Sequence, residues 1–287
     1  MNRNIAAALL ALVIAAPAAA AELAPCGAAG APCQARDAAG AALGVYLARA
    51  PETDSSAPPN GRPAIFFIHG WRSSAEAVMR VDGLRTFADE VGAVLIAPQG
   101  LAQTWSYPGS PSQRRDEFAY FEALRRDAIA RHGVDPDRIL VSGFSMGGSM
   151  AWYLACFAGD RYWAFAPFAG AFWHPMPERC ESPTERLRHV HGTADRMVPL
   201  EGRALGGGFR QRGAGESLNR LASGLELGRG RDLVDAFGMR CAAWAGADDG
   251  AATAPDKGRL LELCLHEGGH IWRPAWLRTA WERFTTR

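Results

Sequence analysis

Six short apolar runs without polar alternation recur along the chain, and they constrain its fold more than any other feature. They begin at Ala64, Ala93, Arg138, Trp163, Leu187 and Leu260. Strands that are buried on both faces have this pattern, and such strands belong to parallel sheets. Segments of helical character separate the runs. The alternation predicts an α/β fold with a mostly parallel, doubly wound sheet that carries helices on both faces.

Several helix ends can be read from the residues between the runs. Ser73 and Glu76 have the spacing of a capping box, and Gly92 suits the position just past the end of the helix that they open. Ser110, followed by Pro111, marks the start of a second helix, which Gly133 ends.

Two segments depart from the alternation. Residues 53–61 (TDSSAPPNG) form a turn-rich connection ahead of the first strong strand. Residues 201–258 form an insert before the last strand, rich in Gly, Arg and Asp, with one good helical stretch around 216–227. A lid over a site and a decorated surface loop both fit this composition.

The N-terminus has the pattern of a secretory signal peptide, with Arg3, an apolar run over 5–16 and small residues before Glu22. The run falls short of the roughly 20 apolar residues that span a bilayer. We therefore expect cleavage after Ala21 and an exported, soluble chain over 22–287, folded as one catalytic domain. The signal peptide does not distinguish the periplasm from the extracellular medium.

The cysteines and the charge balance narrow the class of protein further. Six cysteines, an even number, fit an oxidising compartment. We expect three disulfides between neighbours in the sequence, among the many pairings that six cysteines allow: Cys26 with Cys33, Cys156 with Cys180, and Cys241 with Cys264. Their scattered spacing argues against a metal site. With 31 Lys and Arg against 30 Asp and Glu, nothing indicates a nucleic acid or an anionic membrane as partner.

The stretch GFSMG places Ser145 between Gly143 and Gly147, after a buried strand and before a helix. A nucleophile elbow needs this arrangement, because its serine occupies a strained tight turn and small neighbours let strand and helix approach. The alternative is an ordinary helix N-cap serine beside packing glycines. We interpret Ser145 as a nucleophile.

A serine nucleophile needs a base, and the base needs an acid that fixes its tautomer. His270 follows the last apolar strand and two glycines, and it is the preferred base; His266 is the second candidate. Asp195 lies in the loop after the preceding strand. The order Ser145, Asp195, His270 is the chain order expected of this kind of fold.

Two backbone N–H groups are candidates for an oxyanion hole. One belongs to Met146, directly after the nucleophile, and the other to Trp71, which follows His69 and Gly70. We expect His69 and His191 to be structural. Tryptophans near strand ends can bind an acyl or aryl group, and they are Trp71, Trp105, Trp173 and Trp272. Trp105 is the first choice as a substrate contact, and Trp272 is included with it.

Taken together, FFIHGW, IAPQG with Trp105 downstream, GFSMGG, HGTADRMVP and EGGHIW resemble one family. It is the secreted group of α/β hydrolases similar to polyhydroxybutyrate depolymerases and feruloyl esterases. The motifs run from Ala64 to Trp272. The resemblance implies carboxylic ester hydrolysis through an acyl-enzyme, with Ser145, Asp195 and His270 as the triad and no cofactor.

The resemblance also suggests the substrates: hydroxyalkanoate polymers or oligomers, feruloyl or acetyl esters of plant polysaccharides, or small aryl esters. Depolymerases of solid polyester often carry an appended binding domain, and this chain ends soon after His270. We therefore expect soluble oligomers or small esters. A secreted serine peptidase and a non-catalytic polymer-binding protein on a hydrolase scaffold are the alternatives. The sequence assigns neither the acyl group nor the oligomeric state.

Overall fold

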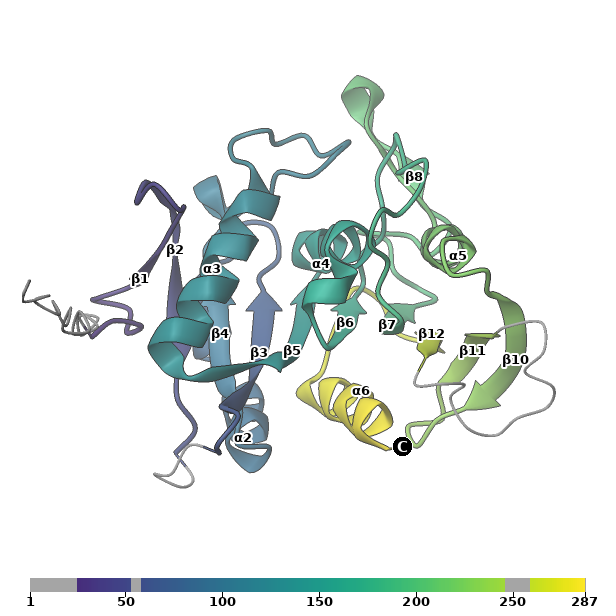
Figure 1. Cartoon of the computed structure of the whole chain (residues 1–287). Coiled ribbons are helices and arrows are strands. Elements are labelled where there is room, and N and C mark those ends of the chain that lie inside the picture. Colours follow the sequence, from purple (N-terminus) through teal and green to yellow (C-terminus); the bar gives the residue numbers. More distant parts are fainter. Residues whose placement is uncertain (1–24, 53–57, 246–258, 287) are drawn as a thin grey trace, which may run out of the picture.

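The computed structural model describes residues 25–52, 58–245 and 259–286 (Figure 1). Three of the segments predicted from the sequence lie wholly or partly outside these ranges. The signal peptide over 1–21 lies outside the described residues, as do 53–57 of the turn-rich connection and 246–258 of the insert.

All six apolar runs form strands. They are β3 (Arg62–Ile68), β4 (Val94–Pro98), β5 (Val134–Phe144), β6 (Ala164–Phe168), β7 (Arg186–Gly192) and β12 (Leu260–His266). These strands lie side by side in the order β4-β3-β5-β6-β7-β12, and every neighbouring pair is parallel. The predicted parallel sheet is confirmed, and its carboxyl ends gather at one edge (Figure 1).

Antiparallel strands extend the sheet on both sides. They are β1 (Cys33–Arg36) and β2 (Ala42–Arg49) beside β4, and β11 (Arg240–Ala245) and β10 (Gly228–Val234) beside β12. The described residues thus form one ten-stranded sheet (Figure 1). The sequence analysis did not predict these four strands. Most of their residues are partly or fully exposed, so the strands lack an uninterrupted apolar run.

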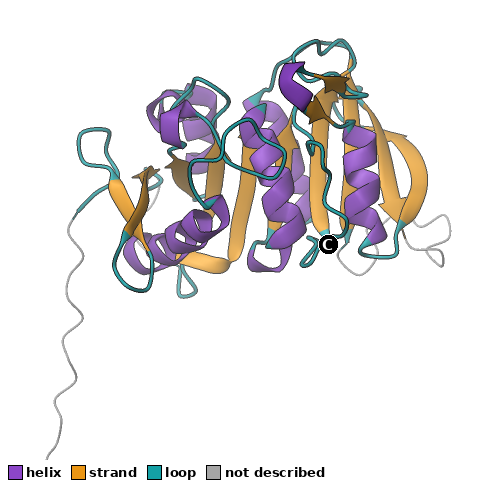
Figure 2. Cartoon of the chain, turned by 90° about the horizontal axis from the view of Figure 1, so that it is seen from above, coloured by secondary structure: helices purple, strands orange, loops and turns teal. Residues whose placement is uncertain are grey.

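Helices cover both faces of this sheet (Figure 2). They are α1 (Ala75–Met79), α2 (Asp82–Glu90), α3 (Glu117–His132), α4 (Met146–Phe157), α5 (Ala214–Ser223) and α6 (Pro274–Thr285). Along β3 the buried side chains alternate between two cores. Phe66 and Ile68 belong to the core that α3, α4 and α5 complete, and Ile65 and Phe67 to the core of α1, α2 and α6.

Both predicted helix starts were wrong, the first by one residue and the second by several. The side chain of Ser74, not Ser73, accepts the Ala77 N–H at the start of α1. Asp116, not Ser110, caps α3. The Ser110 hydroxyl instead donates to the Trp105 carbonyl, which shapes the loop before the helix. Gly92 and Gly133 both have positive φ just past α2 and α3, as expected of C-terminal glycines. The single helix predicted to run from Ser73 to Gly92 is wrong, because α1 ends at Met79 and α2 starts at Asp82.

The three disulfides pair as predicted: Cys26 with Cys33, Cys156 with Cys180, and Cys241 with Cys264. The last one joins directly opposed residues of β11 and β12.

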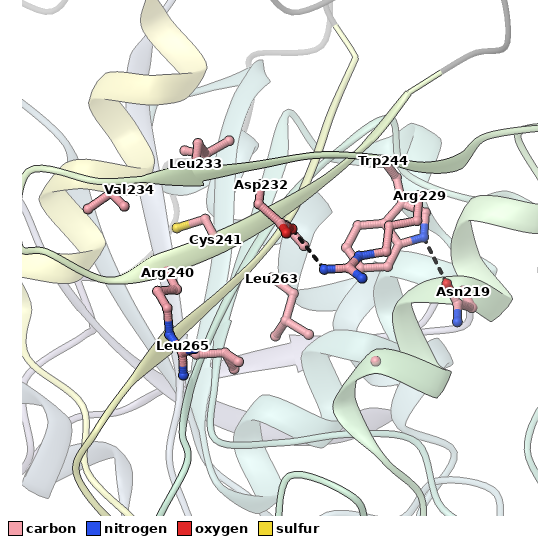
Figure 3. A pocket seen from close by; sticks show the side chains of 12 residues that line it. Asn219, Arg229, Asp232, Leu233, Val234, Arg240, Cys241, Trp244, Leu263 and Leu265 are labelled. Carbon is pink, nitrogen blue, oxygen red and sulfur yellow. Dashed lines mark hydrogen bonds and ion pairs between the residues drawn. The ribbon is translucent and has the colours of Figure 1, made fainter.

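The insert over 201–258 has two parts rather than one. Its first part holds the short antiparallel pair β8 (Arg203–Ala204) and β9 (Arg210–Gln211), which Figure 1 shows at the carboxyl-end side of the sheet, followed by α5. Its second part is β10 and β11, which belong to the sheet. A pocket of about 580 Å³ lies between α5 and these strands, with Trp244, Arg229 and Leu263 in its lining (Figure 3). None of Ser145, Asp195 and His270 lines it.

A buried charge cluster joins β7 to β12, the strands that lead to Asp195 and His270. Arg188 and Glu262 are direct partners in the strand register, both are fully buried, and they form an ion pair. Arg188 also reaches Asp235 at 2.6 Å, and Arg283 of α6 pairs with Glu262. Removing one member of such a cluster leaves an uncompensated buried charge.

We expect Arg188→Leu to lower the free energy of unfolding by about 3–5 kcal/mol, because Asp235 would lose its cation and the buried Glu262 would keep only its pair with Arg283. Urea denaturation with m-value comparison measures this. The matched control is Arg259→Gln, which removes a partly exposed pair with Glu185 and should cost about 1 kcal/mol or less. Equal effects of the two substitutions would contradict the importance of the cluster.

Candidate active site

Ser145 occupies a strained turn between β5 and α4. Its φ of 59° and ψ of −121° are unfavourable for a residue with a side chain, and such strain costs on the order of 1–3 kcal/mol. The flanking glycines make the turn sterically possible. A Cβ on Gly147 would lie 2.1 Å from the Ile68 carbonyl oxygen, and one on Gly143 would lie 2.5 Å from the Gly147 carbonyl oxygen. The geometry is that of a nucleophile elbow, as the sequence predicts.

Asp195 and His270 meet in the loops that follow β7 and β12. The His270 Nδ1 lies 2.7 Å from the Asp195 Oδ2. The other carboxylate oxygen, Oδ1, accepts the N–H groups of Met197 at 2.8 Å and Val198 at 2.9 Å. Both oxygens of Asp195 are therefore fixed, and a carboxylate fixed in this way holds the ring of its partner in one orientation.

These contacts also set the charge of Asp195. Burial by itself would raise the pKa of this carboxyl, but the hydrogen bond from His270 and those from the Val198 and Met197 N–H groups outweigh it, so the pKa lies below its usual value. Asp195 is thus an anion at neutral pH.

His270 lies next to the elbow. Its ring centroid is 4.6 Å from that of Phe144, the residue before Ser145. The His270 side chain is 16% exposed, whereas the Asp195 side chain is fully buried. His270 thus faces the solvent side while Asp195 is shielded.

The two candidate N–H groups of the oxyanion hole also lie at Ser145. Met146 is the first residue of α4, and Trp71 follows Gly70, where an added Cβ would be 3.4 Å from the Ser145 Cβ. Among the described residues, neither the Met146 nor the Trp71 N–H donates to another protein group. Both remain available to an incoming oxygen.

A pocket of about 700 Å³ opens beside Ser145. Its lining includes Trp71 and Met146 from the elbow region, Met197 from the loop after β7, and the β8 and β9 residues Arg203 and Gln211. Arg114, from the loop before α3, also lines it. The sequence analysis missed Arg114, Met197, Arg203 and Gln211, because nothing in their local pattern shows that three separate loops converge there.

Two predicted substrate contacts lie elsewhere. Trp105 is completely buried, and its indole N–H donates to the His69 carbonyl at 2.8 Å, so it supports the loop that carries Trp71 instead of lining the pocket. Trp272 packs against Phe67, with 4.3 Å between ring centroids, on the opposite core. Of the four tryptophans considered, Trp71 and Trp173 line the pocket. Position at a strand end does not reveal the direction of a side chain.

The region around Ser145 and Asp195 matches known proteins. A family model described as Phospholipase/Carboxylesterase matches residues 112–207, which include Ser145 and Asp195. The putative esterase NocK of Nocardia uniformis subsp. tsuyamanensis is 30% identical over 238 residues, 75% of this chain and 66% of that protein. A probable feruloyl esterase C of Aspergillus flavus is 25% identical over 166 residues, 55% of this chain and 57% of that protein. The poly(3-hydroxybutyrate) depolymerase of Ralstonia pickettii is 28% identical over 119 residues, 36% of this chain and 24% of that protein.

A solved structure agrees with these sequence relatives. An acetyl xylan esterase from Aspergillus awamori superposes with a TM-score of 0.61 over 84% of this chain and 93% of that one, at 11% sequence identity. The chain has the α/β-hydrolase fold. The resemblance inferred from its motifs is confirmed, although the chain spans only part of the length of the sequence relatives.

Two further histidines, His69 and His266, are held by structural contacts. The His69 ring lies 2.8 Å from the Gly70 carbonyl through Nδ1 and accepts the Gly100 N–H at Nε2. His266 accepts the Gly268 N–H, and its ring packs on Trp276. His69 thus has the structural role expected of it, and contacts of the same kind hold His266, the second candidate for the base.

Behind Asp195, His191 and His189 form a buried chain in β7. The His191 Nε2 donates to the Val198 carbonyl at 2.7 Å, so its Nδ1 accepts from the His189 Nε2 at 2.9 Å. Burial lowers the pKa of both rings, that of His189 most strongly. Both rings are therefore neutral, and His191 supports the backbone of the loop that fixes Asp195.

No helix within the described part of the hydrolase has the length and apolar character to cross a membrane. Two groups of residues there have the proximity of metal ligands, namely Cys26, Cys33 and His132, and Asp235, Cys241 and Cys264. In each group both cysteines form a disulfide, so they offer no thiolate.

The buried histidines predict that the hydrolase loses stability in mild acid. Their pKa values are lowered in the folded state, so below about pH 6.5 the unfolded chain binds protons that the folded chain does not. The contribution is complete above that pH and declines as the pH falls toward the folded-state values. Asp195 adds a separate loss only below about pH 4, its unfolded range.

Urea denaturation between pH 8 and pH 5 tests this origin of the acid sensitivity. His189→Leu should reduce the slope of the unfolding free energy against pH by up to about 1.4 kcal/mol per pH unit. The control His174→Gln, at an exposed position, should leave the slope unchanged. An unchanged slope in His189→Leu would place the acid sensitivity elsewhere.

Proposed function

We propose that this hydrolase cleaves carboxylic esters through an acyl-enzyme, with Ser145 as nucleophile, His270 as base and Asp195 as the acid that orients it. The observation that carries the proposal is the 2.7 Å contact between the His270 Nδ1 and the Asp195 Oδ2, formed by loops after neighbouring strands beside the Ser145 elbow. A strained serine turn has little structural use without such a partner.

The proposed chemistry follows from the contact between the His270 Nδ1 and Asp195, which leaves the Nε2 to act on Ser145. Because Asp195 accepts the Nδ1 proton of His270, the Nε2 of the neutral ring carries a lone pair that can take the Ser145 proton. The serine oxygen then attacks the ester carbonyl. His270 returns the proton to the leaving alcohol, and water repeats the sequence on the acyl-enzyme. The negative charge of Asp195 stabilises the imidazolium formed in each half.

The carbonyl oxygen becomes negative during both attacks. The free Met146 N–H, at the start of α4, and the free Trp71 N–H are proposed to bind it. Donors fixed before the reaction need no reorganisation as the charge develops. The positive end of the α4 dipole adds to the same effect.

Hydroxyalkanoate oligomers and feruloyl or acetyl esters are the proposed substrate classes. The names of the relatives, a feruloyl esterase and a poly(3-hydroxybutyrate) depolymerase, support them. Apolar lining residues such as Trp71, Met146 and Leu205 suit an acyl chain or an aryl ring. The three disulfides support residence in an oxidising compartment, in agreement with the proposed export signal.

Ser145→Ala should lower kcat for p-nitrophenyl butyrate by at least about a thousandfold, because the nucleophile is lost. Removing the strained side chain should leave the fold and the thermal midpoint intact or slightly raised. Initial rates, circular dichroism and labelling by a fluorophosphonate probe measure these effects. The control Ser223→Ala, at an exposed serine of α5, should keep full activity and labelling.

Matched ester and anilide substrates separate the alternatives. An esterase turns over the ester far faster than the anilide, whereas comparable rates would favour a peptidase. A folded wild-type protein that neither reacts with the probe nor cleaves any ester would favour a binding protein. Near-full activity of Ser145→Ala would contradict the assignment of the nucleophile.

A further inference from the structure

The pocket beside Ser145 has an unbalanced charge. Its lining contains two arginines, Arg114 and Arg203, and no aspartate or glutamate. Resting on the ester hydrolysis proposed above, we infer that this pocket selects esters whose acyl or alcohol part ends in a carboxylate. The two guanidinium groups would bind that carboxylate while the ester lies at Ser145.

Two hydrogen bonds hold the Arg203 guanidinium in one orientation at the pocket. Its Nε donates to the Gln211 side-chain oxygen at 3.1 Å, and its Nη1 donates to the Arg196 carbonyl at 3.1 Å. Gln211 is buried and is the strand partner of Arg203 in the β8–β9 pair. The Nη2 makes no hydrogen bond with another described residue. A guanidinium fixed on two sides loses little conformational entropy when its remaining N–H groups bind an anion.

The two groups that accept hydrogen bonds from Arg203 are neutral, so they do not balance its positive charge. An amide oxygen and a carbonyl oxygen orient the guanidinium, but neither neutralises it. A structural arginine that lies in a protein cleft ordinarily pairs with a carboxylate, as Arg115 does with Glu117 at 2.6 Å in this chain. Arg203 keeps its full positive charge toward the pocket.

Arg114 supplies the second cation from another loop. Its backbone N–H donates to the Ser106 hydroxyl at 2.8 Å, which fixes the chain there, and no ion pair with a described residue engages its side chain. Its side chain is exposed and can adjust to the length of a ligand. The fixed Arg203 and the movable Arg114 therefore suit a carboxylate at a variable distance from the ester.

Two carboxylates close to these loops are engaged elsewhere, while Asp116 and Glu201, each two residues from one of the arginines, do not line the pocket. Asp195 is covered by His270 and by two N–H groups, and Glu117 is buried against Arg115. The rest of the lining is apolar or neutral, including Trp71, Met197 and the pocket side of Gln211. A short chain with one anionic end matches this surface, and the free acid end of a hydroxyalkanoate oligomer has that form.

Two isosteric substrate pairs test the inference, one for each side of the ester. The first is the 3-hydroxybutyrate dimer with its free carboxylate against its terminal primary amide, and the second is monomethyl adipate against its monoamide. In at least one pair, the wild-type kcat/KM should be at least about tenfold higher for the acid, as expected of a charge-assisted hydrogen bond. Raising the salt concentration should reduce this preference, because the pocket is open to solvent.

Arg203→Gln and Arg114→Gln identify the groups responsible. Each should lower kcat/KM for the preferred acid by about ten- to a hundredfold and change that for its amide by less than about threefold. Arg203→Lys should restore part of the preference. The control is Arg210→Gln, which removes the same charge from the adjacent strand β9, where Arg210 does not line the pocket.

Three outcomes would overturn the inference. They are equal rates for acid and amide in both pairs, a loss in the glutamine variants that is the same for both substrates, and an equal effect of Arg210→Gln. In each of them ester hydrolysis itself persists, so the proposed function stands. A wild-type protein that hydrolyses none of the four esters and is not labelled by a fluorophosphonate would instead overturn the proposed function and this inference with it.

Discussion

The close contact between the start of α4 and the backbone of the central strands is the constraint on which the site depends. Side chains larger than hydrogen do not fit there. A Cβ on Gly147 would meet the Ile68 carbonyl oxygen, one on Gly148 would lie 2.4 Å from that of Phe168, and one on Gly170 would lie 2.4 Å from the Ser149 nitrogen. The ends of β3 and β6 and the loop after β6 therefore touch the helix through backbone atoms. This contact fixes the strained angle of Ser145 without any specific side-chain interaction.

The order of the strands places the other parts of the site around Ser145. β3 lies beside β5 and delivers the loop with Trp71, while β7 and β12 are direct neighbours and deliver Asp195 and His270. The buried pair of Arg188 and Glu262 lies in the middle of β7 and β12. Rigid elements thus set the separation of Asp195 and His270, and the loops provide only the last few residues.

An element could be predicted from the sequence where its own residues form a distinctive pattern. Strands buried on both faces, such as β3 and β5, leave an unbroken apolar run, and the elbow needs small residues at fixed spacing, so both could be predicted. Edge strands such as β10 have mostly exposed side chains and leave no run. Trp105 was misjudged because its direction depends on a hydrogen bond to the His69 carbonyl, a contact 36 residues away in sequence. The pocket lining was hidden for the same reason, since β8 and β9 have two residues each.

Several backbone contacts join the β8–β9 pair to the rest of the molecule. The His174 N–H donates to the Arg210 carbonyl at 2.8 Å, the Arg212 N–H donates to the Phe172 carbonyl at 2.9 Å, and Trp173 bridges to Gln211. Backbone contacts tolerate replacement of the side chains that they carry. One wall of the pocket can therefore change its chemistry through substitutions in β8 and β9 while Ser145, Asp195 and His270 keep their supports. In evolutionary terms, the proposed reaction centre and the proposed substrate surface rest on different elements, so substitutions in this short segment are expected to change substrate preference without altering the proposed triad.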